Sequence, residues 1–309
     1  MDAEPIVAAL DVPVLDRRRF VDYTVLSDYW ALTKPEVNFL IVITTFAGFY
    51  LGCAPYLQDF PFLPLINTVL GTLLVASSAG TLNQYIERRF DSQMRRTARR
   101  PLAAGRLKPS AVLRFGLALS AVGSIYLALA VNVLASLLAI FTLLSYLFCY
   151  TPLKRKTPLC TLVGAVPGAM PPLIGWAAAS GKLTFEAWTL FAVIFLWQFP
   201  HFMAIAWMYR DDYDRAGYLV LPRGAGQARF AILQTVLPLL ILVPLSLLPG
   251  LGTQPSIAYC IAALFLSAGF FYYGAKFALR RSPSAARRML AASIIYLPLM
   301  FALMIFPRT

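Results

Sequence analysis

The sequence predicts an all-α polytopic membrane protein with nine transmembrane helices, and three observations lead to this fold class. Hydrophobic residues make up 59% of the 309 residues and charged residues only 13%, which is far more apolar than a soluble domain. The apolar residues fall into runs of about 20, the length that a helix needs to cross a bilayer. Nearly all basic residues lie in alternate connecting segments, as in a polytopic protein.

Nine apolar runs follow one another along the chain, each long enough for one crossing. A helix satisfies its backbone hydrogen bonds internally, and the runs lack the short alternating pattern of barrel strands, so helices are expected. In chain order, the expected spans are residues 37–53, 61–86, 111–131, 133–150, 159–179, 184–208, 229–249, 255–278 and 289–306.

The basic residues distinguish the two ends of these spans. Of the 27 Lys and Arg residues, only Lys182 and Arg308 lie on one side, and the other 25 lie in the N-terminal segment and every second connection. Cytoplasmic loops retain positive charge during insertion, so the N-terminus is expected in the cytoplasm and the C-terminus outside. Residues 1–33 lack the apolar core of a secretory signal and are expected to form a cytoplasmic tail.

Several function classes lack their usual marks. The net charge of +13 is explained by the arginines that set the topology, so no nucleic-acid partner is expected. Neither a GxxxxGK[ST] loop nor a GxGxxG turn is present, which disfavours nucleotide-driven transport and dinucleotide chemistry. The cysteines have no paired spacing and predict neither zinc binding nor disulfides. They are Cys53, Cys149, Cys160 and Cys260.

Acidic side chains gather at the expected cytoplasmic ends of the second and sixth spans. Asn83, Glu87 and Asp91 follow one another at four-residue intervals, so they drift only ~40° per step and share one helix face. Asp211 and Asp212 follow the sixth span. Because Mg²⁺ is bound by carboxylates together with substrate phosphates, these five residues are candidate catalytic metal ligands.

Basic side chains accompany both acidic clusters and suit a phosphate-bearing substrate. Guanidinium groups make bidentate contacts with phosphate oxygens, and the apolar surroundings favour a lipid diphosphate whose tail lies among the helices. The alternative is that the acids only neutralise topological arginines in surface ion pairs of little energetic value. The candidate diphosphate contacts are Arg95, Arg96, Arg100, Lys154, Arg155, Lys156 and Arg210.

His201 is the only histidine and lies inside the sixth span. It precedes Asp212 by about 16 Å along a helix axis and shares its face. Imidazole is a common ligand of haem iron, but a lone membrane histidine also donates hydrogen bonds to neighbouring helices, so both roles are open. Trp197 and Tyr209 are candidate substrate contacts because aromatic faces attract cations, although such residues also serve as membrane anchors.

Prolines lie inside or beside several expected helices. Proline removes a backbone donor and kinks a helix, so these residues either open a central cavity or only shape the packing. They are Pro35, Pro167, Pro171, Pro172 and Pro200.

Six motifs lie between Leu32 and Gly217, within a resemblance that covers roughly residues 30 to 306. The pattern N-x-x-x-E-x-x-x-D-x-x-M-x-R-T-x-x-R-P-L runs from Asn83 to Leu102, and the others are LTKPEV, YTPLKRKTP, GAVPGAMPPLIGWAAASG, FLWQFPHF and YRDDYDRAG. Together they resemble the UbiA superfamily of intramembrane prenyltransferases and, within it, the branch that farnesylates haem. Glu87 departs from the Asp that is usual there, and Asp211 and Asp212 carry over better than Asp214 because the fully spaced D-x-x-x-D of some relatives is missing.

The resemblance implies a nine-helix bundle with a central cavity that opens near the cytoplasmic side. It implies a tail at 1–33, an intramembrane prenyltransferase domain at 34–309 and a place in the cell (inner) membrane. The implied reaction transfers farnesyl from farnesyl diphosphate to a vinyl group of haem B, giving haem O, with Mg²⁺ as cofactor. Haem A synthase and oxidase-assembly proteins are candidate partners besides the lipid bilayer.

Two other functions remain open at this point. A related enzyme of the same superfamily would prenylate an aromatic or quinone-precursor acceptor. A non-catalytic haem transporter or chaperone would explain the bundle and His201, but it leaves the paired acidic clusters without a role.

Overall fold

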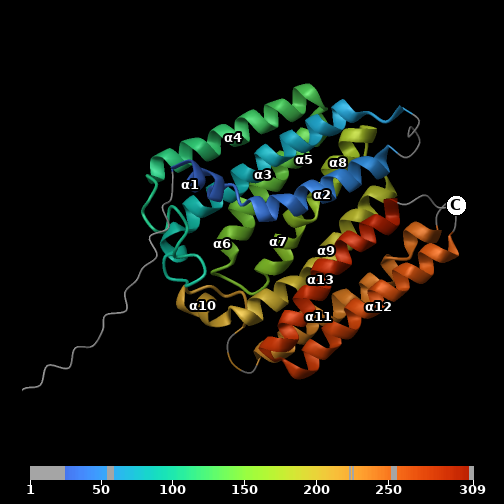
Figure 1. Ribbon diagram of the computed structural model, residues 1–309. Coiled ribbons are helices and arrows are strands. Elements are labelled where there is room, and N and C mark those ends of the chain that lie inside the picture. The colour runs from blue at the N-terminus through green and yellow to red at the C-terminus, as the bar shows by residue number, and fades with distance from the viewer. Residues whose placement is uncertain (1–24, 54–58, 223, 225, 252–255, 306–309) are drawn as a thin grey trace, which may run out of the picture.

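Long helices make up most of the computed structural model, which describes residues 25–53, 59–222, 224, 226–251 and 256–305 (Figure 1). Within these residues nine helical segments are long and apolar enough to cross a membrane, and no strand occurs. The predicted fold class is therefore confirmed. Most of the expected tail, residues 1–24, and the C-terminal residues 306–309 with Arg308 lie outside the described residues.

Each expected span corresponds to one or more helices. Only two boundaries differ by five residues or more: the second span continues to Asp91 and the last begins at Pro283, because polar helical turns extend beyond the apolar stretch. The spanning helices are α2 (Pro35–Gly52), α3 (Phe62–Asp91), α4 (Pro109–Ala130), α5 (Val133–Leu144) with η2 (Ser145–Tyr150) and α6 (Thr151–Leu153), α7 (Cys160–Gly168) with α8 (Met170–Ser180), α9 (Phe185–Met208), α11 (Gly226–Leu245), α12 (Ile257–Arg280) and α13 (Pro283–Ile305).

Two of the spans are irregular where prolines occur. Pro167 lies inside α7, and the next two prolines occupy the first turn of α8, so the fifth span bends at Ala169. The end of the fourth span widens into the π-helix η2 just before Pro152, which has no N–H to continue the α-helical ladder. Both irregular segments carry residues of the cavity described below.

Helices α2 and α8 approach each other through glycines. A Cβ added to Gly48 would overlap the carbonyl oxygen of Pro172, and a Cβ on Gly175 would overlap the carbonyl oxygen of Thr45. Small residues allow helix backbones to come this close in a membrane. This contact fixes the bent fifth span against the first one.

Three short segments lie together at one end of the bundle: α1 (Val25–Leu32), α6 and α10 (Arg210–Arg215) (Figure 1). Helix α1 falls within the segment expected to form a tail. Its buried Asp28 accepts hydrogen bonds of 2.8–3.0 Å from the guanidinium of Arg106, and its Leu32 packs in a small core with Leu102. The loop between α3 and α4 is thereby held against α1.

Gly175→Ala is expected to destabilise the protein by roughly 1–3 kcal/mol, because the new methyl group overlaps the α2 backbone, which cannot move aside as a flexible side chain would. Gly269→Ala in α12 is the control, since no atom of another helix lies within 4 Å of its added Cβ. Thermal unfolding in detergent measures both variants. Equal melting temperatures would show that the α2–α8 approach is not tight.

Candidate functional site

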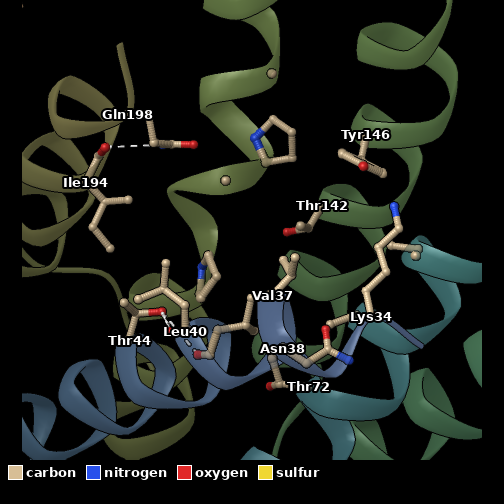
Figure 2. A pocket seen from close by; sticks show the side chains of 18 of the residues that line it. Lys34, Val37, Asn38, Leu40, Thr44, Thr72, Thr142, Tyr146, Ile194 and Gln198 are labelled. Atoms are coloured by element: carbon tan, nitrogen blue, oxygen red, sulfur yellow. Dashed lines mark hydrogen bonds between the residues drawn. The ribbon is translucent and has the colours of Figure 1, made fainter. Parts of the chain in front are cut away.

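A cavity of about 510 Å³ opens inside the bundle. Helices α2, α3, α5, α7, α8 and α9 contribute to its walls, together with η2 and Leu297 of α13. Its volume is within the ~300–1,000 Å³ of ordinary ligand sites. Most of the lining is apolar, and Figure 2 shows the scattered polar side chains, with Lys34 extending along the wall towards Tyr146.

The acidic face of α3 lies next to the end of this cavity that Lys34 marks. Asn83, Glu87 and Asp91 are all buried, with at most 5% of each residue exposed. Buried carboxylates are costly unless they are paired, because they lose their hydration. The sequence spacing therefore places three oxygen-bearing side chains on one buried helix face, as expected from the four-residue interval.

Each of these three side chains meets a cation from a different segment. Lys34 donates a 2.9 Å hydrogen bond to Oδ1 of Asn83. The ammonium of Lys154 lies 2.9 Å from Glu87, and Arg100 Nη1 donates to both carboxylate oxygens of Asp91 at 2.9 and 2.8 Å. One cation therefore contacts the amide oxygen of Asn83, and one cation pairs with each of the two carboxylates. Neither buried acid on this face is left without a compensating charge.

Lys34 occupies an unusual position at the junction of α1 and α2. Its φ of 54° is left-handed, a conformation that non-glycine residues adopt uncommonly. Burial lowers the pKa of Lys34 to about 7, and the nearby charges of Arg100 and Lys154 act in the same direction. Lys34 thus places an ammonium group of lowered pKa at the boundary between the polar cluster and the cavity.

Lys154 has the opposite electrostatic environment. Burial acts to lower its pKa, but Tyr150 and Glu87 outweigh burial and hold the pKa of Lys154 well above its ordinary value. Its ammonium also lies 4.6 Å from the centre of the Tyr150 ring. Tyr218 is close by, and burial together with the Glu87 charge raises the pKa of its hydroxyl, which makes no hydrogen bond of normal geometry to the described residues.

The second acidic cluster is joined to the α3–α4 loop. Asp212 is buried at 9% exposure, pairs with Arg215, and accepts a 3.3 Å hydrogen bond from the backbone N–H of Arg96. The Arg96 guanidinium lies 5.0 Å from the centre of the Tyr209 ring and donates to the Tyr213 hydroxyl at 3.2 Å. Residues expected from two distant motifs therefore meet at one end of the bundle.

Other predicted residues lie at the edge of this arrangement. The Asp211 side chain is 86% exposed and lies 3.6 Å from Arg210 Nε. The Arg155 guanidinium lies 4.2 Å from the centre of the Phe90 ring. Arg95 and Lys156 are exposed. These side chains are accessible to solvent and could contact a substrate only from the surface, unlike the buried ion pairs on α3.

The donors on α3 fit Mg²⁺ in kind, since carboxylate and amide oxygens are the ligands it takes. Among the described residues no three His, Cys, Asp or Glu side chains converge on one point. Asn83 and Asp91 are ~12 Å apart along the helix axis, so one ion with ligands at ~2.1 Å cannot bind both. Adjacent pairs of these residues would hold separate ions, with substrate oxygens completing the coordination.

His201 lies on the cavity wall, away from the charged end. Its ring stacks on Trp197, with ring centres 4.7 Å apart and planes at 28°. His201 Nδ1 lies 2.8 Å from the Ser293 hydroxyl of α13, and Trp197 Nε1 donates to the Ser293 carbonyl at 2.8 Å. Both rings are thereby fixed to the neighbouring helix.

The sequence profile of the UbiA prenyltransferase family matches residues 41–303. The chain belongs to the UbiA prenyltransferase family. It is 46% identical over 289 residues to the protoheme IX farnesyltransferase of Solibacter usitatus, covering 92% of this chain and 99% of that one.

Two solved structures are similar to this chain in fold. A digeranylgeranylglyceryl phosphate synthase superposes with a TM-score of 0.72 at 20% identity, covering 91% of this chain and 97% of that one. A UbiA homolog from Archaeoglobus fulgidus bound to DMAPP and Mg²⁺ has a TM-score of 0.61 at 16% identity, covering 90% and 99%. The family assignment makes this chain a prenyltransferase.

Several residues of the site were not singled out from the sequence. The sequence did contain a signal for Lys34, because a lysine directly before Pro35, at the start of a span, is expected near the membrane surface. Thr151, whose hydroxyl accepts a 3.3 Å hydrogen bond from Asn83, and Tyr218 carried none. Ser293 lies in an apolar run 92 residues after His201, and only the packing of α13 on α9 brings the two together.

Lys154→Met is expected to lower the free energy of unfolding by about 3 kcal/mol, because Glu87 would be left buried without its hydrogen-bonded cation. Lys156→Met removes the same charge from an exposed position and should change stability by about 0.5 kcal/mol or less. Denaturant unfolding in detergent compares them. Similar losses in both variants would contradict the role assigned to the Glu87–Lys154 pair.

Proposed function

We propose that this chain transfers farnesyl from farnesyl diphosphate to a vinyl group of haem B and so forms haem O. The observation that carries the proposal is the junction of a buried acid–base cluster with an apolar cavity whose wall holds the chain's only histidine. Relatives that carry the name protoheme IX farnesyltransferase, at 41–46% identity over most of the chain, support the same substrates.

The charged end binds the diphosphate in this proposal. Glu87, Asp91 and Asp212 are the carboxylates that would hold Mg²⁺, with Asn83 adding an amide oxygen. Bound Mg²⁺ supplies Lewis-acid stabilisation of charge on the departing diphosphate. Lys154 and Arg100 leave their carboxylate partners for phosphate oxygens, so the same cations compensate the acids before binding and the leaving group after it.

The cavity holds the farnesyl chain and the acceptor. Breaking the C–O bond leaves an allylic cation, which the vinyl group attacks, and one water then supplies the product hydroxyl and releases a proton. Tyr146 and Tyr150 line the wall next to Lys34, where their ring faces can stabilise the cation. The apolar lining keeps other water away from the cation before the new bond forms.

His201 orients haem B in this proposal. The imidazole lies on the cavity wall, and its helix leads on to Asp212 at the charged end, so the porphyrin would lie deeper than the diphosphate. Imidazole nitrogen is a common axial ligand of haem iron. Loss of this contact should weaken haem binding without affecting farnesyl diphosphate.

The test is to incubate the purified protein with haem B, farnesyl diphosphate and Mg²⁺ and to analyse the haem by mass spectrometry. The proposal predicts a haem carrying both the farnesyl group and one added water. Unmodified haem, with an aromatic or quinone-precursor acceptor prenylated in a parallel reaction, would assign the chain to a different acceptor. Binding of haem with no reaction on any acceptor would indicate a carrier.

Asp91→Asn is expected to reduce turnover by about 100-fold or more, because it removes a buried charge from the proposed Mg²⁺–diphosphate site. Asp59→Asn is the control, since Asp59 is exposed and belongs to the connection between α2 and α3. Steady-state rates at saturating Mg²⁺ compare the two. Near-normal turnover in Asp91→Asn would show that Asp91 of α3 does not belong to the Mg²⁺–diphosphate site.

We also propose that the charged end faces the cytoplasm, since 25 of the 27 Lys and Arg residues belong to that side or to the N-terminal segment. In intact cells, an impermeant thiol reagent added outside should label a cysteine introduced at Lys182 and miss one introduced at Lys156. Both positions are exposed, so access to the side chain is not limiting. External labelling at Lys156 would reverse the orientation.

A further inference from the structure

The hydroxyl of Ser293 has two oxygen or nitrogen neighbours and only one hydrogen. It lies 2.6 Å from the carbonyl oxygen of Leu290 and 2.8 Å from Nδ1 of His201. A carbonyl oxygen cannot donate, and two oxygens at 2.6 Å without an intervening hydrogen would repel each other. The serine hydrogen therefore lies on the bond to Leu290.

This assignment determines the protonation of the imidazole. With its hydrogen directed at Leu290, the Ser293 oxygen can only accept from His201, so Nδ1 carries the hydrogen of the neutral ring. The other nitrogen, Nε2, then has a free lone pair. Among the described residues Nε2 has no hydrogen-bond partner, and the ring belongs to the cavity wall.

Two further contacts fix the plane of the ring. Trp197 stacks on His201 and donates through Nε1 to the carbonyl oxygen of the same Ser293, at 2.8 Å. Ser293 itself is fully buried. One residue of α13 therefore holds both aromatic rings of α9, and the imidazole can neither flip nor exchange its tautomer without breaking a buried hydrogen bond.

We propose that Ser293 is a positioning residue that fixes His201 as the Nδ1–H tautomer and directs the Nε2 lone pair into the cavity as the ligand for haem iron. The proposal rests on the proposed function for its ligand, because an iron porphyrin is the substrate that this lone pair would bind. Ligating histidines commonly donate their second N–H to such a partner, and loss of that partner costs about 10–100-fold in metal affinity.

The tautomer can be measured without haem. The chain has one histidine, so untagged protein labelled with ¹⁵N in the imidazole ring gives a single ring spin system in nanodiscs. The wild type should show Nδ1 protonated and Nε2 unprotonated. Ser293→Ala should shift the ring towards Nε2–H or a mixture. A wild-type ring protonated at Nε2 would overturn the proposal, whatever the protein does with haem.

Haem affinity and spectrum provide the second measurement. Ser293→Ala should bind haem B about 10–100-fold more weakly, with loss of the imidazole-ligated absorption spectrum and unchanged affinity for farnesyl diphosphate. Ser293→Thr keeps the hydroxyl and should restore the spectrum. Ser267→Ala is the matched control, because it removes a buried, hydrogen-bonded serine from α12 outside the cavity lining.

The outcomes distinguish the positioning role of Ser293 from the haem-binding role of His201. If His201→Ala loses the ligated spectrum and Ser293→Ala keeps wild-type affinity and spectrum, His201 binds haem but Ser293 does not position it. If both variants bind haem as the wild type does, the haem role of His201 fails as well. If Ser293→Ala and Ser267→Ala lose stability and haem affinity equally, Ser293 is only a packing residue and the positioning role is wrong.

Discussion

The structure depends on compensating the buried carboxylates of α3. An uncompensated buried ion costs several kcal/mol, so Glu87 and Asp91 can stay on a buried helix face only if cations reach them. Lys154 and Arg100 do so from two connections that are far apart in the sequence. This electrostatic requirement draws separate loops to the end of the bundle where the α3 carboxylates lie.

In the function that we propose, the same requirement makes the site responsive to a ligand. A diphosphate with Mg²⁺ brings both signs of charge, so carboxylates can exchange ammonium or guanidinium partners for metal while those cations move to phosphate. No net charge has to be buried without a partner at any stage. The apolar cavity next to this cluster then separates two kinds of chemistry, ionisation at the charged end and carbon–carbon bond formation among aromatic and aliphatic side chains.

Much of the fold could be predicted because the membrane restricts what the sequence can form. Span positions follow from apolar runs, and the shared face of Asn83, Glu87 and Asp91 follows from helix geometry. The irregular segments were harder to predict. Prolines indicated kinks, but whether a kink opens a cavity depends on how the neighbouring helices pack. The short helix α1 also escaped notice, because its eight residues are too few to cross a membrane and too few to show a clear helical period.

The site could be predicted only where its residues are local in the chain. Two acidic motifs were visible, but the partner of each acid is set by tertiary packing, as with Lys154 for Glu87. Contacts across long separations, such as Ser293 with His201, leave no signal in a single sequence. The exposure of Asp211 beside the buried Asp212 likewise could not be read from two adjacent identical residues.

Binding of a non-ionising thiodiphosphate analogue of farnesyl diphosphate, measured by calorimetry with and without Mg²⁺, tests the central claim most directly. The exchange of ion pairs for metal and diphosphate predicts tight binding only when Mg²⁺ is present, and a large loss of that Mg²⁺ dependence in Glu87→Gln. Equal affinity with and without Mg²⁺, in the wild type and in Glu87→Gln alike, would show that the acids of α3 are structural ion pairs and would contradict the account.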